Sequence, residues 1–124
     1  MELDPALLLL IARILVGGAF LVIGVRILLS LKLVAGFLAA KNIPYPTFVA
    51  ASGAAIEIVL GALAIAGIAL PAVSIGLALF VVAATLMGHD FWNQKGPQRS
   101  MELGTAISHL IMVGGLVALA AASL

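Results

Sequence analysis

Three ionisable side chains lie well inside long apolar runs of this 124-residue chain: Arg13, Glu57 and His109. Hydrophobic residues make up 65% of the sequence and charged residues only 9%, so an ionisable group within an apolar run stands out. At the centre of a bilayer a charged side chain costs at least ~2.5–3.5 kcal/mol, so such groups are usually paired or functional. These three residues are the candidates for an intramembrane polar site.

Arg13 and Glu57 are predicted to reach similar depths in a bilayer. Arg13 lies about eight residues, roughly 12 Å, from the outer end of the first apolar run. Glu57 lies about nine residues, roughly 14 Å, from the inner end of the second run, which returns antiparallel. The two could form a structural ion pair, or a polar pocket for a quinone head group or a proton-carrying Glu57. Arg26 is a rival partner, although it could instead reach the membrane interface.

The two histidines suggest a second polar position. His89 ends the third apolar run, and His109 lies about two turns into the fourth. Facing histidines could ligate haem, but counting residues puts His109 about 12 Å deeper than His89, so haem is not expected. The default is an interfacial cap at His89 and a hydrogen-bonded interior position for His109, and either could serve a head group that titrates near neutral pH.

Other kinds of chemistry lack the residues they need. The sequence has no cysteine, and nothing offers the three or four close ligands of a metal site. No nucleophile with a neighbouring base stands out, so no catalytic residue is predicted and the chain is not expected to be an enzyme on its own. With a net charge of +1 and no basic patch, no nucleic-acid partner is expected.

The apolar runs predict an all-α integral membrane four-helix bundle in a single domain, residues 1–124. A helix needs about 20 apolar residues to cross a bilayer. The acidic residues before the first run argue against a cleaved signal peptide, and Asp4 followed by Pro5 is typical of a helix start. The expected spans are approximately residues 6–31, 48–70, 71–92 and 101–123.

The connections predict two helical hairpins, one from the first two spans and one from the last two. Residues 32–41 could continue as a helix along the interface until the prolines at 44 and 46 break it, with Thr47 capping the second span. The middle spans are joined by a short turn at residues 67–71. Residues 88–100 form the most polar loop.

Positive charge is concentrated on one side of the predicted bundle. The positive-inside rule then places loops 32–47 and 88–100 in the cytoplasm and both termini outside. Asp90 is expected to pair with Lys95 or Arg99 in the second loop. Residues expected at the interface are Arg26, His89, Asp90 and Trp92, and the four cations of the loop side are Lys32, Lys41, Lys95 and Arg99.

Small residues flank the charged positions on the predicted helix faces. One face of the first span carries Arg13, Gly17, Phe20 and Gly24, and one face of the second carries Gly53, Glu57, Gly61 and Ala64. Small residues let membrane helices approach closely. These two faces are therefore expected to pack together, and Gly114 with Gly115 offers a similar notch in the fourth span.

The chain resembles the DoxX family of small four-helix bacterial membrane proteins. The resemblance rests on Arg13 with Phe20 and Gly24, on Asn42-Ile-Pro-Tyr-Pro46, on Ile56-Glu57 with Gly61, on His89-Asp-Phe-Trp92 and on Val113-Gly-Gly-Leu116. Members often carry a basic residue just after the second span, where this chain has Ala69-Leu70-Pro71, and Asn before the last glycines, where it has His109. The resemblance implies a place in a bacterial inner membrane, and a quinone-related role or a part in a membrane redox complex.

Three functions remain open from the sequence. The first is an accessory or assembly subunit of a larger respiratory or redox membrane complex, in contact with lipid and with other subunits or further copies of itself. The second is a quinone-interacting oxidoreductase subunit that uses Arg13, Glu57 and His109. The third is a small transporter or channel, which would need an oligomer to form a pathway.

Overall fold

The structure is a computed structural model, and it describes residues 3–124. Four of its helices are long and apolar enough to cross a membrane, which confirms the predicted all-α membrane bundle. The elements in chain order are α1 (Pro5–Leu29), α2 (Leu31–Ala40), α3 (Pro46–Ala66), α4 (Leu70–Gly88), the short 3₁₀ helix η1 (Phe91–Asn93) and α5 (Gly96–Ala122).

The helix ends follow local chemistry, with some shifts from the predicted bounds. Asp4 caps α1 by accepting a 3.0 Å hydrogen bond from the Ala6 N–H, as predicted. The predicted Thr47 cap of the second span is wrong. Tyr45 precedes that helix in a left-handed conformation (φ 51°), and Pro46, whose fixed φ suits a first helical position, begins it. In the same way α5 begins at Gly96, five residues earlier than expected, with Pro97 in its first turn.

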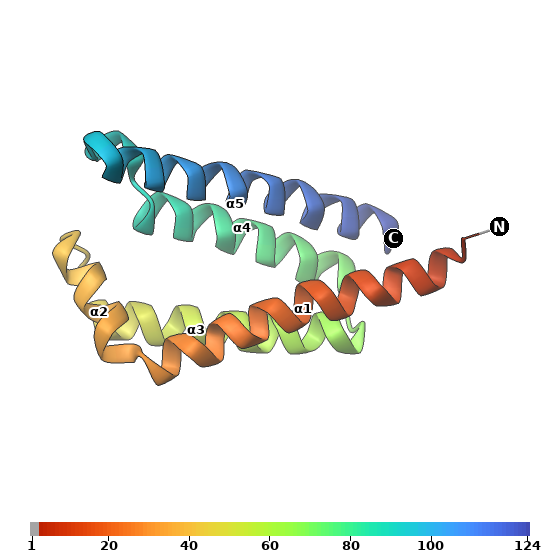
Figure 1. Ribbon diagram of the computed structural model, residues 1–124. Coiled ribbons are helices and arrows are strands. Elements are labelled where there is room, and N and C mark those ends of the chain that lie inside the picture. The colour runs from red at the N-terminus through yellow and green to blue at the C-terminus, as the bar shows by residue number, and fades with distance from the viewer. Residues whose placement is uncertain (1–2) are drawn as a thin grey trace.

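The four long helices form two antiparallel hairpins (Figure 1). The α1 and α3 helices cross as one pair, and α4 runs beside α5 as the other. The short α2, which confirms the predicted helix after the first span, packs against α3. Figure 1 places α2 and the α4–α5 connection, together called the loop end below, opposite the described chain ends and the α3–α4 turn.

Glycines allow the α1 and α3 backbones to touch. A Cβ atom at Gly17 would lie 2.5 Å from the Gly61 carbonyl oxygen, and one at Gly61 would lie 2.7 Å from the Gly17 carbonyl oxygen. A Cβ at Gly24 would come within 2.8 Å of the Ala54 carbonyl oxygen. The predicted faces therefore pack together at Gly17, Gly24 and Gly61, whereas Gly53 of the predicted second-span face lies against Phe80 of α4. The three close glycines set the register between α1 and α3.

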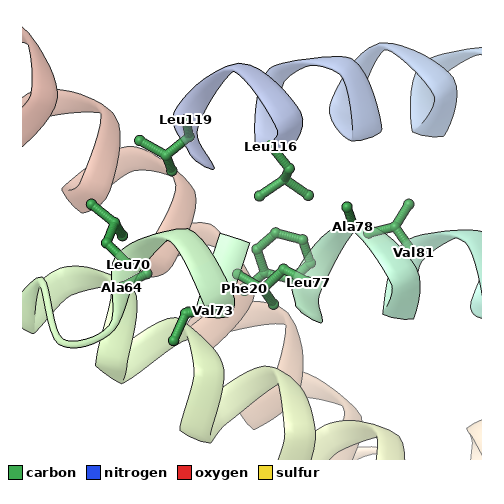
Figure 2. Packing of buried hydrophobic residues seen from close by; sticks show 9 residues of the cluster. All are labelled: Phe20, Ala64, Leu70, Val73, Leu77, Ala78, Val81, Leu116 and Leu119. Carbon is green, nitrogen blue, oxygen red and sulfur yellow. The ribbon is translucent and has the colours of Figure 1, made fainter. Parts of the chain in front are cut away.

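The two hairpins meet in one apolar core (Figure 2). Phe20 of α1 projects between Leu77 of α4 and Leu116 of α5, and Leu77 and Leu116 are almost fully buried. Ala64 of α3 belongs to the same cluster. Phe20 thus joins the α1–α3 hairpin to the α4–α5 hairpin.

Candidate functional site

Arg13 caps the end of α3. Its Nη2 donates a 2.7 Å hydrogen bond to the carbonyl oxygen of Ile65, and its Nε donates one of 3.3 Å to that of Ala64. These carbonyls belong to the last turn of α3, where the helix dipole favours a cation. Next to them Gly67 has φ 75°, and a Cβ there would lie 2.7 Å from the Arg13 guanidinium carbon. The left-handed turn therefore leaves room for Arg13.

The predicted pair between Arg13 and Glu57 is wrong. The contact of Gly17 with Gly61 places Arg13, one turn before Gly17, beside Ala64 and Ile65. Glu57 lies about two turns, roughly 12 Å, before Ile65 in α3, nearer the start of that helix. Counting residues from the span ends predicts similar depths for Arg13 and Glu57. The register between α1 and α3, which the Gly17–Gly61 contact sets, separates them.

Glu57 is a buried carboxyl group whose described surroundings offer no counter-ion. Only 6% of the residue is exposed, and among residues 3–124 its Oε2 atom is enclosed without a hydrogen-bond partner. Glu57 is one of the residues that border a cavity of about 180 Å³ between α1, α2, α3 and α4. Its other walls are apolar or small, among them Leu38, Gly53, Phe80 and Met87. An acidic residue thus borders an otherwise apolar cavity.

The cavity runs from Glu57 towards the loop end of the bundle. Glu57 is the wall residue of α3 furthest from that end, whereas Leu38 of α2 and Gly88 of α4 lie close to it. Just beyond, Lys41 forms a 2.6 Å ion pair with Asp90. This pair links the end of α2 to the loop after α4 and so joins the two hairpins next to the cavity.

The partner of Asp90 differs from the prediction, which named Lys95 or Arg99. Asp90 accepts hydrogen bonds from Lys41, Asn93 and Gln94. Arg99 instead places its guanidinium carbon 5.8 Å from the centroid of the Phe91 ring. Lys41 reaches Asp90 because α2 and η1 lie at the same end of the bundle, a contact between loops 49 residues apart in sequence.

The two histidines are neighbours, contrary to the predicted 12 Å difference in depth. Their ring centroids are 5.1 Å apart, in an edge-to-face arrangement. The His109 Nδ1 atom lies 2.7 Å from the Thr85 hydroxyl. His89 follows Thr85 by one helical turn, about 6 Å, so its ring also reaches His109. The rings touch and leave no space for a porphyrin between them.

Glu102 and Thr85 complete this histidine cluster and were missed in the sequence. The Glu102 Oε2 atom lies 2.8 Å from the His89 Nδ1 atom. The sequence does contain a pattern that indicates the cluster: Thr85 and His89 are spaced i, i+4, and Glu102 and His109 are spaced i, i+7. Each spacing places two polar residues on one helix face.

The remaining predicted interfacial residues lie at the loop end. Arg26 is exposed in the last turn of α1. Trp92 belongs to η1, is 51% exposed, and packs edge-to-face against Phe91 with ring centroids 5.3 Å apart. Neither residue contributes to the Glu57 cavity or to the histidine cluster.

Comparison with known families agrees with this architecture. The DoxX family model matches residues 8–90, more than half of the chain. The chain belongs to the DoxX family. It is a small integral membrane protein, and no curated protein or solved structure matches it.

The DoxX match includes Arg13 and Glu57 but ends at Asp90. It therefore covers α1 to α4 and leaves α5 outside, including the Gly114–Gly115 notch that also suggested the family. Glu57 and its cavity lie in the matched region. His109 and Glu102 lie beyond it.

Proposed function

We propose that this DoxX-family protein is a subunit of a membrane redox complex and binds a quinone head group beside Glu57. The observation that carries the proposal is that Glu57, a buried acid whose Oε2 atom has no partner among residues 3–124, borders an apolar cavity. The cavity is smaller than the ~300–1,000 Å³ typical of sites for drug-sized ligands, so it suits one ring and not a whole lipid. A quinone ring is flat and apolar, and its carbonyl oxygens accept hydrogen bonds.

Glu57 would bind such a ring as a hydrogen-bond donor. A carboxyl group without a counter-ion is least costly to bury as the neutral acid, which has one O–H to donate. A quinone carbonyl in the cavity would accept that hydrogen bond, while Leu38, Phe80 and Met87 would contact the ring. The isoprenoid tail would remain in the bilayer.

Replacing Glu57 tests this role. We expect Glu57→Leu to weaken binding of decylubiquinone about tenfold, because one buried hydrogen bond is lost, and Glu57→Gln to weaken it less, because an amide still donates. Neither variant should lower the free energy of unfolding, since the structure gives Glu57 no ion pair to lose. The measurements are quinone titration in nanodiscs and unfolding of the same variants.

Two results would contradict this proposal. Unchanged quinone affinity in Glu57→Leu would remove Glu57 from the site. A large loss of stability in Glu57→Gln would instead favour the structural role considered from the sequence. Ser108→Ala is a suitable control because Ser108 is exposed and, among residues 3–124, its hydroxyl bonds to the Gly104 carbonyl in its own helix turn and to nothing else.

The accessory role is supported by an open groove on the outside of the bundle. The α1 and α5 helices touch little, and two neighbouring cavities of about 310 and 420 Å³ lie between them. Gly115 borders both, and a Cβ added at Gly114 or Gly115 would meet nothing within 4 Å. A helix of another subunit could approach there closely.

The accessory role predicts stoichiometric protein partners. They can be identified after purification of the protein from native membranes, and an isolated protein with no partner would contradict the role.

The proposed orientation places the loop end in the cytoplasm of a bacterial cell. The ion pair of Lys41 with Asp90 supports one shared side for both cationic loops. The chain has no cysteine, so a single cysteine that replaces Lys95 or Ser123 is its one reactive thiol. Labelling of that thiol shows which side of the membrane the corresponding end of the bundle faces. In intact spheroplasts, a membrane-impermeant maleimide should label position 123 and not position 95. The reverse labelling would contradict this orientation.

A further inference from the structure

We propose that His109 forms a second ligand site, separate from Glu57, that binds the hydroxyl group of a membrane-soluble phenol or alcohol. The site lies on the α4–α5 hairpin. Its ligand is recognised as a hydrogen-bond donor, whereas the ligand proposed for Glu57 is an acceptor.

The hydrogen bonds of Thr85 indicate which ring nitrogen of His109 carries the proton. The Thr85 hydroxyl has one proton and lies 2.7 Å from the Val81 carbonyl oxygen, to which it donates. The same hydroxyl oxygen lies 2.7 Å from the His109 Nδ1 atom, and both contacts are hydrogen bonds at the same time only when Nδ1 carries a proton and donates it to that oxygen. In the neutral imidazole the other nitrogen, Nε2, is then a bare acceptor.

Among residues 3–124, the hydrogen bond of His109 is made by its Nδ1 atom, to Thr85, and none is made by Nε2. Inside a bilayer no bulk water is present to satisfy such an atom, so a ligand that donates a hydrogen bond gains free energy there. His109 and Thr85 border a pocket of about 140 Å³ between α4 and α5. The other walls are apolar, among them Val82, Leu86, Leu110 and Val113. The pocket therefore suits an apolar molecule with one hydroxyl group.

His89 and Glu102 hold His109 in place. The His89 ring packs edge-to-face against His109, and its Nδ1 donates to the Glu102 carboxylate at 2.8 Å. Glu102 in turn accepts a 3.0 Å hydrogen bond from Gln98. His89 is thus a positioning residue, fixed from the loop end, and the His109 ring is confined between it and Thr85.

The new site and the Glu57 cavity lie on different faces of α4. Val82, Thr85 and Leu86 border the His109 pocket, whereas Phe80, Ala84 and Gly88 border the Glu57 cavity. The two cavities share no wall residue. Loss of one site therefore need not affect the other.

The test compares 4-octylphenol with octylbenzene, which differ by one hydroxyl group, in nanodiscs that carry the wild-type protein. We expect octylphenol to bind about five- to tenfold more tightly, the effect of one hydrogen bond. The C–H signals of the His109 ring in a nuclear magnetic resonance spectrum should shift with octylphenol alone. Equal affinities for the two compounds would overturn the proposal without any mutation.

Variants locate the site. His109→Phe keeps a ring of similar size but no nitrogen, so the preference for octylphenol should disappear, while Ser108→Ala should retain it. If His109→Phe still prefers octylphenol over octylbenzene, the proposal is overturned. It is also overturned if only Glu57→Gln loses this preference, because the phenol would then occupy the Glu57 cavity. Quinone binding that fails at Glu57 while octylphenol still requires His109 would reject the proposed function and leave this site standing.

Discussion

Replacing Arg13 with methionine should lower the free energy of unfolding by about 2–4 kcal/mol, the largest loss we expect from any single side chain. A hydrogen bond from a charged group contributes about 1.5–3 kcal/mol, and Arg13 makes one of 2.7 Å to Ile65 and a longer, weaker one of 3.3 Å to Ala64. Without the guanidinium group, the carbonyl oxygen of Ile65 loses the side-chain donor that the structure provides at the end of α3.

Arg26 provides the matched control for Arg13. It lies in the same helix but is exposed in the last turn, so Arg26→Met should change the free energy of unfolding by no more than about 0.5 kcal/mol. Both variants can be unfolded in mixed detergent–SDS micelles. Equal stabilities of the Arg13 and Arg26 variants would show that capping of α3 contributes little.

Replacing Gly17 with alanine should destabilise the bundle, whereas the same change at Gly18 should not. A Cβ at position 17 would lie 2.5 Å from the Gly61 carbonyl oxygen, which is backbone and cannot turn aside. Overpacking of this kind costs about 1–3 kcal/mol. A Cβ at position 18 would meet nothing within 4 Å. Alanine in a helix is favoured over glycine by about 0.5–1 kcal/mol, so Gly18→Ala should be neutral or slightly stabilising.

Gly17→Ala and Gly18→Ala make the same chemical change at adjacent positions of α1. Their unfolding midpoints in SDS should therefore separate, with Gly17→Ala the less stable. A double variant with Gly61→Ala should be less stable still, because both backbones carry the added methyl. Identical midpoints for Gly17→Ala and Gly18→Ala would contradict the close α1–α3 contact.

Much of the fold could be predicted because membrane helices have strong local signals. The lengths of the apolar runs identified four spans, and the prolines at 44 and 46 marked the break before α3. The spacing of Gly17, Gly24 and Gly61 identified the faces that pack. These features depend on residues near one another in sequence, or on one helix face, where periodicity is informative.

The polar contacts could not be predicted from the sequence. They depend on the register between packed helices and on the positions that the tips of long side chains reach. Arg13 and Glu57 have similar calculated depths, yet Gly17 against Gly61 shifts α1 so that Arg13 meets the end of α3. Lys41 and Asp90 meet because two separate loops lie at one end of the bundle. His89 reaches His109 from the turn after Thr85, a contact that counting residues from the span ends missed.

The most direct test of the central claim is an infrared difference spectrum of the protein in nanodiscs, recorded with and without decylubiquinone. The carbonyl stretch of a protonated carboxylic acid responds to the hydrogen bond that the acid donates. Binding at Glu57 predicts a shift of one such band in the wild-type protein, and its absence in Glu57→Gln. A spectrum that quinone leaves unchanged, or a band shift that persists in Glu57→Gln, would contradict the assignment of Glu57 as the quinone ligand.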